Sequence, residues 1–276
     1  MPLRTPKFLD AETLFALAEY ADVDVPLQQE ITERTVKNRK GGGKLGFGKS
    51  EVGGERGTEV EVQTSYTLAP NQKAAVSKVL DRLIADEHVL SASNDTTLHK
   101  DLPLVLEGTA HLTTASVAGK LLYVVLQAIR SAETSLDDLK SGQMPAGVEE
   151  ALKGVYLGNQ LVPVPTLFEV QGTGLQPRVL LSVRPGHFVD AAAPDHLEGE
   201  IGLVGTVEAL VADEDFLNAE KWLLHGWEWM VKRTLMTTMD DMVAGLSKAL
   251  NVDLPADDIQ AYIPGPAVVI DAVAVY

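Results

Sequence analysis

The chain has 276 residues, of which 45% are hydrophobic and 22% charged, so the composition predicts a globular protein rather than a disordered one. The formal net charge of −16 disfavours non-specific binding to nucleic acid or anionic lipid, and the lack of cysteine excludes disulfides, thiolate nucleophiles and cysteine-ligated zinc. No apolar run reaches the ~18 residues of a membrane span, so we expect a soluble, cytoplasmic protein.

The N-terminal part predicts one helix and then a long loop. Asp10 fits the N-cap of a helix with leucine and alanine on one face. The stretch from Arg34 to Ser50 holds six basic residues and no acidic one, and eight glycines lie between positions 41 and 57. Glycine makes a regular element unfavourable. We therefore expect a flexible basic loop over 34–57, ordered only by a partner.

The next elements alternate between strand and helix. We expect strands over 59–68 and 104–112, a helix from Pro70 to His88, and a second helix capped by Thr113 or Thr114. A polar stretch over 132–147 is the best candidate for a domain boundary. The chain is then an N-terminal α+β region, 1–140, and a C-terminal α+β domain, 145–276; one continuous domain is the alternative.

The C-terminal part predicts the core of the fold. A helix over 148–157, a hairpin of strands over 163–171 and 178–183 and a short helix over 185–193 precede a half-buried strand over 200–211. Apolar residues then recur at helical spacing from Trp227 to Leu250. The last strand, 267–276, is apolar on both parities except at Asp271, as expected of a strand covered on both faces. We predict an α+β fold whose mixed sheet has a buried C-terminal strand, with a long amphipathic helix packed on it.

One motif matches the phosphate-loop pattern of nucleotide-binding proteins. Its candidate residues are Gly43, Lys44, Gly46, Gly48, Lys49 and Ser50. Such a loop normally joins a buried strand to a helix, but here a polar basic stretch precedes it and a glycine-rich stretch follows. The pattern therefore favours a linker over a nucleotide-hydrolysing site. An intermediate interpretation is a basic arm, 34–50, that contacts the phosphates of nucleic acid or another anionic ligand.

Two further groups of residues are candidates for binding. His187, Asp190 and His196 could supply nitrogen and oxygen ligands for zinc or manganese, although their spacing matches no established metal motif and a polar surface turn is the alternative. Within the helix 220–250, a partner protein or a second copy could bind an adaptable apolar surface, with core packing as the alternative. Its candidate residues are Trp227, Met230, Met239 and Met242. No catalytic motif is present, and we expect no cofactor.

Several short motifs resemble an uncharacterised bacterial and phage-associated family of unknown function. These motifs are Phe8-Leu-Asp10, the Gly/Lys-rich variable loop, Glu107-Gly-Thr109, Leu203-Val-Gly-Thr-Val207, Gly265-Pro-Ala267 and Ala274-Val-Tyr276. The proline that such proteins often place in the last strand is replaced here. The resemblance implies no assigned activity, and it favours a linker at the phosphate-loop match.

The sequence thus leads to two functional hypotheses. The first is a non-enzymatic cytosolic binding or regulatory protein, in a phage-defence or mobile-element setting. The alternative is a nucleotide- or nucleic-acid-binding protein that uses the basic glycine-rich loop 34–50 to contact phosphate.

Overall fold

The computed structural model describes residues 4–39, 43–47, 58–62, 65–157, 162–190, 192–252, 254, 259 and 261–276. For 34–39, 43–47 and 58–62 only the backbone is described.

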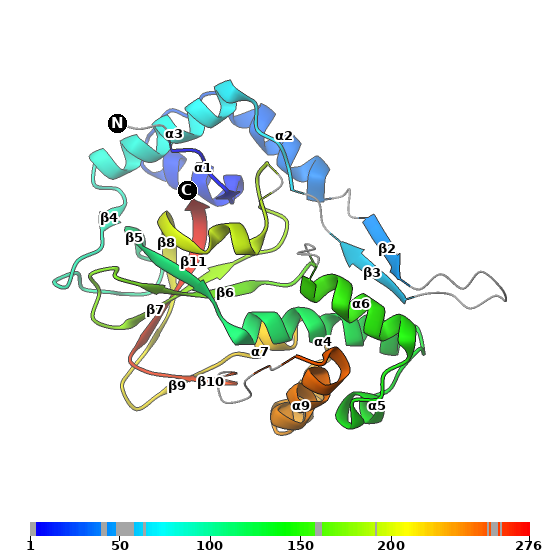
Figure 1. The fold of residues 1–276 in the computed structure, drawn as a ribbon. Coiled ribbons are helices and arrows are strands. Elements are labelled where there is room, and N and C mark those ends of the chain that lie inside the picture. Colours follow the sequence, from blue (N-terminus) through cyan, green and yellow to red (C-terminus); the bar gives the residue numbers. More distant parts are fainter. Residues whose placement is uncertain are drawn as a thin grey trace.

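Five strands of the main sheet close into a barrel (Figure 1). They are β5 (Pro103–Leu112), β6 (Thr166–Gln171), β7 (Arg178–Val183), β8 (Gly199–Val211) and β11 (Ala267–Val275). The order around the ring is β5-β6-β7-β11-β8 and back to β5; β7 and β11 run parallel, and the other four pairs are antiparallel. This order is that of the OB type of Greek-key barrel. The predicted α+β class, with a mixed sheet, is confirmed.

The barrel interior is filled by apolar side chains that alternate along each strand, as the two-residue period of a strand requires. This interior core includes Leu104, Leu106, Phe168, Val170, Val179, Leu181, Ile201, Leu203, Val268 and Ile270. Two short strands extend the sheet: β1 (Phe8–Leu9) pairs with the end of β11, and β4 (Leu90–Ser91) pairs with β5. Every residue of β11 is buried, which confirms the predicted C-terminal strand.

Two groups of helices cover the outside of the barrel (Figure 1). The first comes from the N-terminal part of the chain and comprises α1 (Ala11–Tyr20), α2 (Gln28–Arg39) and α3 (Pro70–Ala85). The second is built from two insertions. The β5–β6 insertion holds α4 (Thr114–Arg130), α5 (Leu136–Ser141) and α6 (Ala146–Leu157). The β8–β11 insertion holds β9 (Phe216–Asn218), α7 (Glu220–Leu223), α8 (Trp229–Met236), α9 (Met239–Leu250) and β10 (Tyr262–Pro264).

Two glycines let these insertions approach each other closely. A methyl group added at Gly119 of α4 would lie 2.1 Å from the carbonyl oxygen of Trp222, and one added at Gly245 of α9 would lie 1.8 Å from that of Leu139. Both contacts join one insertion to the other. The two insertions therefore form a single layer, which shares one apolar core with the outer face of β6, β7 and β11.

The predicted long helix is wrong, because the chain bends at Thr237 and Thr238 and forms α8 and α9 instead. The hydroxyl of Thr237 donates to the carbonyl of Thr234 at 2.7 Å, a local bond that competes with continued helix. Asp240 and Asp241 then suit the first turn of a new helix. The second helix, α9, lies against α5 and α6 rather than directly on the C-terminal strand.

Other local expectations also differ. Region 34–57 is not a continuous loop, since α2 extends to Arg39 and β2 (Gly43–Phe47) pairs with β3 (Thr58–Val62). The stretch 132–147 contains α5, which Ser135 and Asp138 cap at its start. It does not separate two sheets, because β5 lies in the same ring as β6. Residues 185–190 form no helix; they make isolated bridges to Phe8 and Tyr66.

The strand β8 is buried on both faces rather than one. Residues 201–205 are all buried, because helices cover the outside of the barrel there. A bulge lies between the pairs Val269–Ala209 and Ile270–Val207, so no residue of β11 lies directly opposite Glu208 in the strand register. Beyond the bulge, Ala209 and Val211 pack against the helical insertions instead of the barrel interior.

Candidate functional site

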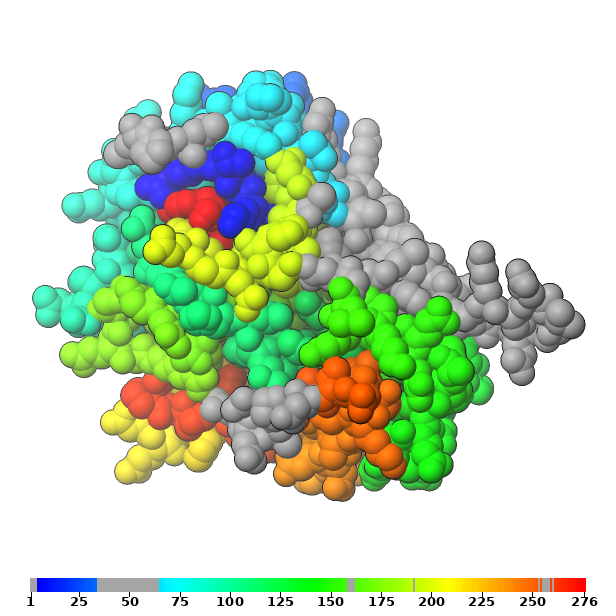
Figure 2. Space-filling view, viewed as in Figure 1, coloured from blue at the N-terminus to red at the C-terminus, as the bar shows by residue number. Residues whose placement is uncertain are grey.

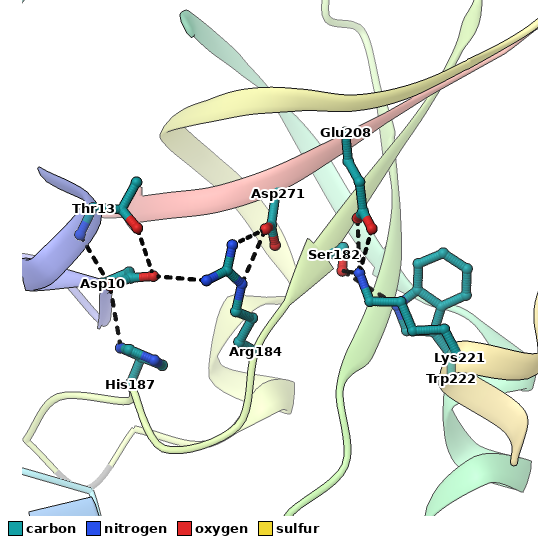
Figure 3. A network of polar contacts seen from close by, with 9 residues as sticks. All are labelled: Asp10, Thr13, Ser182, Arg184, His187, Glu208, Lys221, Trp222 and Asp271. Carbon is teal, nitrogen blue, oxygen red and sulfur yellow. Dashed lines mark hydrogen bonds and ion pairs between the residues drawn. The ribbon is translucent and has the colours of Figure 1, made fainter. Parts of the chain in front are cut away.

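A band of polar side chains crosses the outside of the barrel between the two helical groups (Figure 3). We call it the polar belt; it comprises Asp10, Ser182, Arg184, His187, Glu208, Lys221 and Asp271. Asp271 lies on β11 between Val269, which packs on the insertions, and Val273, which packs on α1 and α3. Ser182 of β7 is its register partner. The belt therefore marks the boundary between two apolar cores on one side of the barrel wall.

Arg184 is the centre of the belt. Its Nε donates to Asp271 Oδ2 at 3.0 Å, a second guanidinium nitrogen contacts the same oxygen, and Nη1 donates to Asp10 Oδ2 at 3.3 Å. The hydrogen bond to Asp271 raises the pKa of Arg184, which burial partly opposes. Both carboxylates are buried, whereas the arginine side chain is 46% exposed. One half-exposed cation thus neutralises two buried anions.

Asp10 also fixes the start of α1. Its carboxylate accepts hydrogen bonds from the backbone N–H of Thr13 at 3.2 Å and from the Thr13 hydroxyl at 3.0 Å, as an N-cap does, and the predicted cap is confirmed. His187 Nδ1 lies 3.8 Å from its other side at Oδ1. The backbone N–H of Asp10 donates to Val273 of β11 at 2.8 Å. The N-terminal helix is therefore tied to the C-terminal strand at this point.

The other half of the belt joins β8 to the β8–β11 insertion. Lys221 Nζ donates to both oxygens of Glu208, at 2.6 and 2.8 Å, and lies 3.4 Å from the Ser182 hydroxyl. The indole N–H of Trp222 donates to the same hydroxyl at 3.3 Å. The bulge at Glu208 directs its carboxylate toward α7. These bonds hold α7 against the barrel wall.

The chemistry available to the belt is limited. Its lysine and its arginine are each bonded to a carboxylate, and the Ser182 hydroxyl is completely buried. One buried oxygen, Asp271 Oδ1, has no hydrogen-bond partner among the residues that the structure describes. A general base or nucleophile must reach a substrate. The belt is better suited to clamp the elements together than to catalyse a reaction.

A second polar feature is an open cleft of about 510 Å³ beside the β6–β7 hairpin. The hairpin turn, 172–177, and Pro266 form part of its lining. Its charged groups, Glu169 and Arg178, form an ion pair with an N–O distance of 2.5 Å. The cleft therefore offers a ligand no unpaired charge among its described lining residues.

The phosphate-loop candidates fall in two parts. Gly43, Lys44 and Gly46 lie on β2, an extended strand whose residues pair with β3 from Gly43 to Phe47. Phosphate binding by such a motif requires curled backbone amides between a strand and a helix. The described part of the motif has no such curl. Gly48, Lys49 and Ser50 lie outside the described residues.

The metal-ligand candidates do not form a ligand group. His187 is buried beside Asp10, while Asp190 forms an ion pair with Lys73 and accepts a hydrogen bond from Leu68 N at 3.3 Å. His196 is exposed, and its Nδ1 accepts a hydrogen bond from Ala193 N at 3.1 Å. Within the described part of the chain, no three His, Asp or Glu side chains are placed to hold a metal ion.

The partner-interface candidates divide between core and surface. Trp227, Met239 and Met242 are buried in the core of the helical layer, so the core alternative is correct for these three. Met230 lies on the surface at the start of α8. Sequence reasoning missed the exposed neighbour Trp229, which comes two residues after Trp227 and would therefore lie on the opposite side of the expected helix.

Met230 belongs to a larger set of exposed apolar side chains. Phe216 is 68% exposed, Trp229 69%, Met230 67% and Tyr262 51%. All four come from the β8–β11 insertion. We call this set the ribbon patch, because Phe216 and Tyr262 lie on the two-stranded ribbon of β9 and β10.

The ribbon has one buried and one exposed face. Phe216 pairs with Pro264 and Asn218 pairs with Tyr262, so these four residues share a face, and all are exposed. Leu217 and Ile263 point the other way and pack on the helical core. Figure 2 shows the two strands, in yellow and red-orange, side by side at the lower edge of the molecule.

Polar contacts connect the ribbon to α8. The Asn218 side chain accepts a hydrogen bond from Glu220 N at 2.8 Å, and Lys232 Nζ lies 3.8 Å from Glu220 Oε1. Trp229 precedes Lys232 by three residues and therefore lies on the same side of α8. Glu220, at the start of α7, thus contacts both the ribbon and α8.

Comparison with protein-family models, with curated protein sequences and with solved structures finds no match to this chain. The resemblance to the uncharacterised bacterial family stays a prediction. Among the helices of the described residues, none is long and apolar enough to cross a membrane.

Proposed function

We propose that this chain is a non-enzymatic binding protein that docks a protein partner on the ribbon patch. A cytosolic regulatory role, in the phage-defence or mobile-element setting that the family resemblance implies, is part of this proposal. The partner surface comprises Phe216, Trp229, Met230 and Tyr262, in place of the buried residues expected from the sequence.

The observation that carries the proposal is the concentration of exposed aromatic and methionine side chains in one insertion. Nine large hydrophobic side chains are exposed in the described residues, and the β8–β11 insertion supplies four of them. Single exposed apolar residues are ordinary, whereas a grouped set indicates a binding surface. Tryptophan, tyrosine and methionine are also the residue types that protein interfaces favour.

The position of the patch supports the same conclusion. In OB-type barrels the two connections that correspond to the β5–β6 and β8–β11 insertions flank the ligand site. Here the insertions pack on each other and on the outer face of β6 and β7, so they cover the wall itself. The accessible surface at this position is then the outer surface of the insertions, which carries the ribbon patch. Fold analogy alone does not assign a function.

The test uses Trp229→Ser/Met230→Ser and a control that removes two apolar side chains elsewhere that are even more exposed, Tyr20→Ser/Leu157→Ser. We expect both variants to keep the free energy of unfolding within about 0.5 kcal/mol of wild type, because surface changes of this kind are small. Affinity capture from the source cells should recover a protein partner with wild type and the control, but not with the patch variant. Equal recovery with all three proteins would contradict the proposal.

A second candidate is binding of nucleotide or nucleic acid by the basic region 34–50. It is favoured by α2 and β2, which carry four of the six basic residues and lead into a two-stranded ribbon (Figure 1). A β-ribbon is one of the elements that read DNA grooves. In the register of this ribbon, however, Lys44 is opposite Glu61 and Gly46 opposite Glu59.

The second candidate has its own test. Filter binding with DNA, RNA and labelled nucleotides is repeated after Lys37, Arg39, Lys40, Lys44 and Lys49 are changed to alanine. Salt-dependent binding that the substitutions abolish would support it. No binding by the wild-type protein would remove it.

A further inference from the structure

Four carboxylate side chains adjoin residues of the ribbon patch in the sequence. Asp213, Glu214 and Asp215 immediately precede Phe216, and Glu228 immediately precedes Trp229. All four are exposed, and none of their side chains forms a hydrogen bond or an ion pair with the described residues. We call these four residues the acidic rim.

The cations near the patch do not neutralise the negative charge of the acidic rim. Lys232 is already paired with Glu220 at 3.8 Å, and Lys221 with Glu208 at 2.6 Å. Arg233, on α8, is the exposed cation of this helix without a partner in the described part of the chain. The surface around the exposed aromatic side chains is therefore negative, like the chain as a whole at −16.

From this surface we infer that the partner is a polypeptide segment that combines lysine or arginine with apolar side chains. The inference rests on the proposed binding function of the ribbon patch. Carboxylates pair with such cations, and the faces of Trp229, Phe216 and Tyr262 also attract them. The apolar side chains of the segment would cover the aromatic rings and Met230. Complementary charge then selects the partner and speeds its association.

The same charges disfavour other occupants. A second copy that docked its own patch symmetrically would place one acidic rim against another, and like charges at an interface are repulsive. Nucleic acid is disfavoured for the same reason, because phosphates would face carboxylates. A basic polypeptide with apolar side chains can contact both the apolar and the charged parts of this surface.

The experiment measures fluorescence anisotropy with three short labelled peptides of equal length. One contains lysine, arginine and leucine; the second has glutamate at the basic positions; the third keeps the basic residues but has serine in place of leucine. We expect wild type to bind the first peptide at least about tenfold more tightly than either of the others. Binding of the first peptide should weaken as salt is raised, because the exposed charges are screened.

Two charge variants locate the binding. Asp213→Asn/Glu214→Gln/Asp215→Asn removes three rim charges, and Glu19→Gln/Asp22→Asn/Asp24→Asn removes three exposed charges next to α1, on the other helical group. We expect the rim variant to lose about tenfold in affinity for the first peptide and the control less than about twofold. Equal losses in both variants would mean attraction to net charge alone and would overturn the inference.

Other outcomes separate this inference from the proposed function. If Trp229→Ser/Met230→Ser abolishes capture of the cellular partner but the rim variant captures it normally, the patch is functional and the basic class of partner is wrong. Equal binding of the basic and acidic peptides by wild type, or no binding of either, would also overturn the inference. So would a wild-type dimer in light scattering that Trp229→Ser/Met230→Ser converts to a monomer, since the occupant would then be a second copy.

Discussion

The polar belt holds buried polar side chains, whereas the ribbon patch holds exposed apolar side chains. In the belt, Arg184 is bonded to the buried carboxylates of Asp10 and Asp271, and Lys221 to the partly exposed carboxylate of Glu208. On the patch, aromatic rings are exposed, and the carboxylates of the acidic rim are unpaired among the described residues. Buried polar groups need their partners to be tolerated at all, whereas an exposed apolar group gains free energy only when something covers it. The difference indicates a stabilising role for the belt and supports the proposed binding role of the patch.

The largest expected effect comes from removing the cation of the belt. Arg184→Met should lower the free energy of unfolding by about 3 kcal/mol, because it leaves the buried carboxylates of Asp10 and Asp271 without their counter-charge. Chemical denaturation with equilibrium fluorescence measures the loss. Peptide binding at the ribbon patch should not change under conditions where the variant is folded.

Two controls show whether uncompensated charge causes that loss. Arg82→Met breaks an exposed ion pair with Asp86 on α3 and should cost at most about 0.5 kcal/mol. Adding Asp271→Asn to Arg184→Met removes one of the stranded charges and should recover part of the stability. If the double variant is no more stable than Arg184→Met, the loss comes instead from the packing of the apolar part of the arginine side chain.

The next effect concerns the layer that carries the patch. On an exposed helix, Gly→Ala stabilises by about 1 kcal/mol. At Gly245 the added methyl group would meet the carbonyl oxygen of Leu139 at 1.8 Å, so we expect Gly245→Ala to destabilise by about 1–3 kcal/mol. A thermal unfolding curve decides the sign. Stabilisation would mean that α5 and α9 can separate without cost, and the patch would then lack a rigid support.

The sequence predicted the elements more reliably than the site. The buried strand at 267–275 and the N-cap at Asp10 follow from local residue patterns, and both are confirmed. Barrel closure depends on which strands pair over long range, and no local pattern specifies that β8 contacts both β5 and β11. The apolar spacing from Trp227 to Leu250 spans two helices, and its residues pack in the helical core on both sides of the bend at Thr237. Three of the four expected interface residues, Trp227, Met239 and Met242, belong to that apolar stripe and are therefore in the core.

The belt was hidden for a related reason. Asp271 was visible as the one polar residue of an apolar strand, which is the signal that could have identified it. Its partner Arg184 lies 87 residues away along the chain, and the second partner of Arg184, Asp10, lies 174 residues from Arg184. Spacing along the sequence carries no information about such contacts. Only the folded chain brings these groups together.

The smallest effect is a pH dependence that should distinguish the patch region from the belt. His225 lies between α7 and α8, and burial, together with the nearby positive charge of Lys232, lowers its pKa below the usual 6.5. The folded protein therefore binds this proton less readily than the unfolded chain. Neutral His225 therefore contributes to the free energy of unfolding. This contribution is fully present above about pH 6.5 and is lost as the pH falls from there through the lower pKa of the folded state.

In the belt, the raised pKa of Arg184 keeps its guanidinium charged across this whole range. We therefore expect the wild-type melting temperature to fall more steeply between about pH 6.5 and 5 than that of His225→Gln, which cannot take up the proton. Arg184→Met should keep the wild-type slope at a lower melting temperature. Parallel curves for wild type and His225→Gln would show that His225 is as well hydrated in the folded protein as in the unfolded chain. Because His225 lies between α7 and α8, which lead from the ribbon to Trp229, that result would also weaken the case for an ordered surface there.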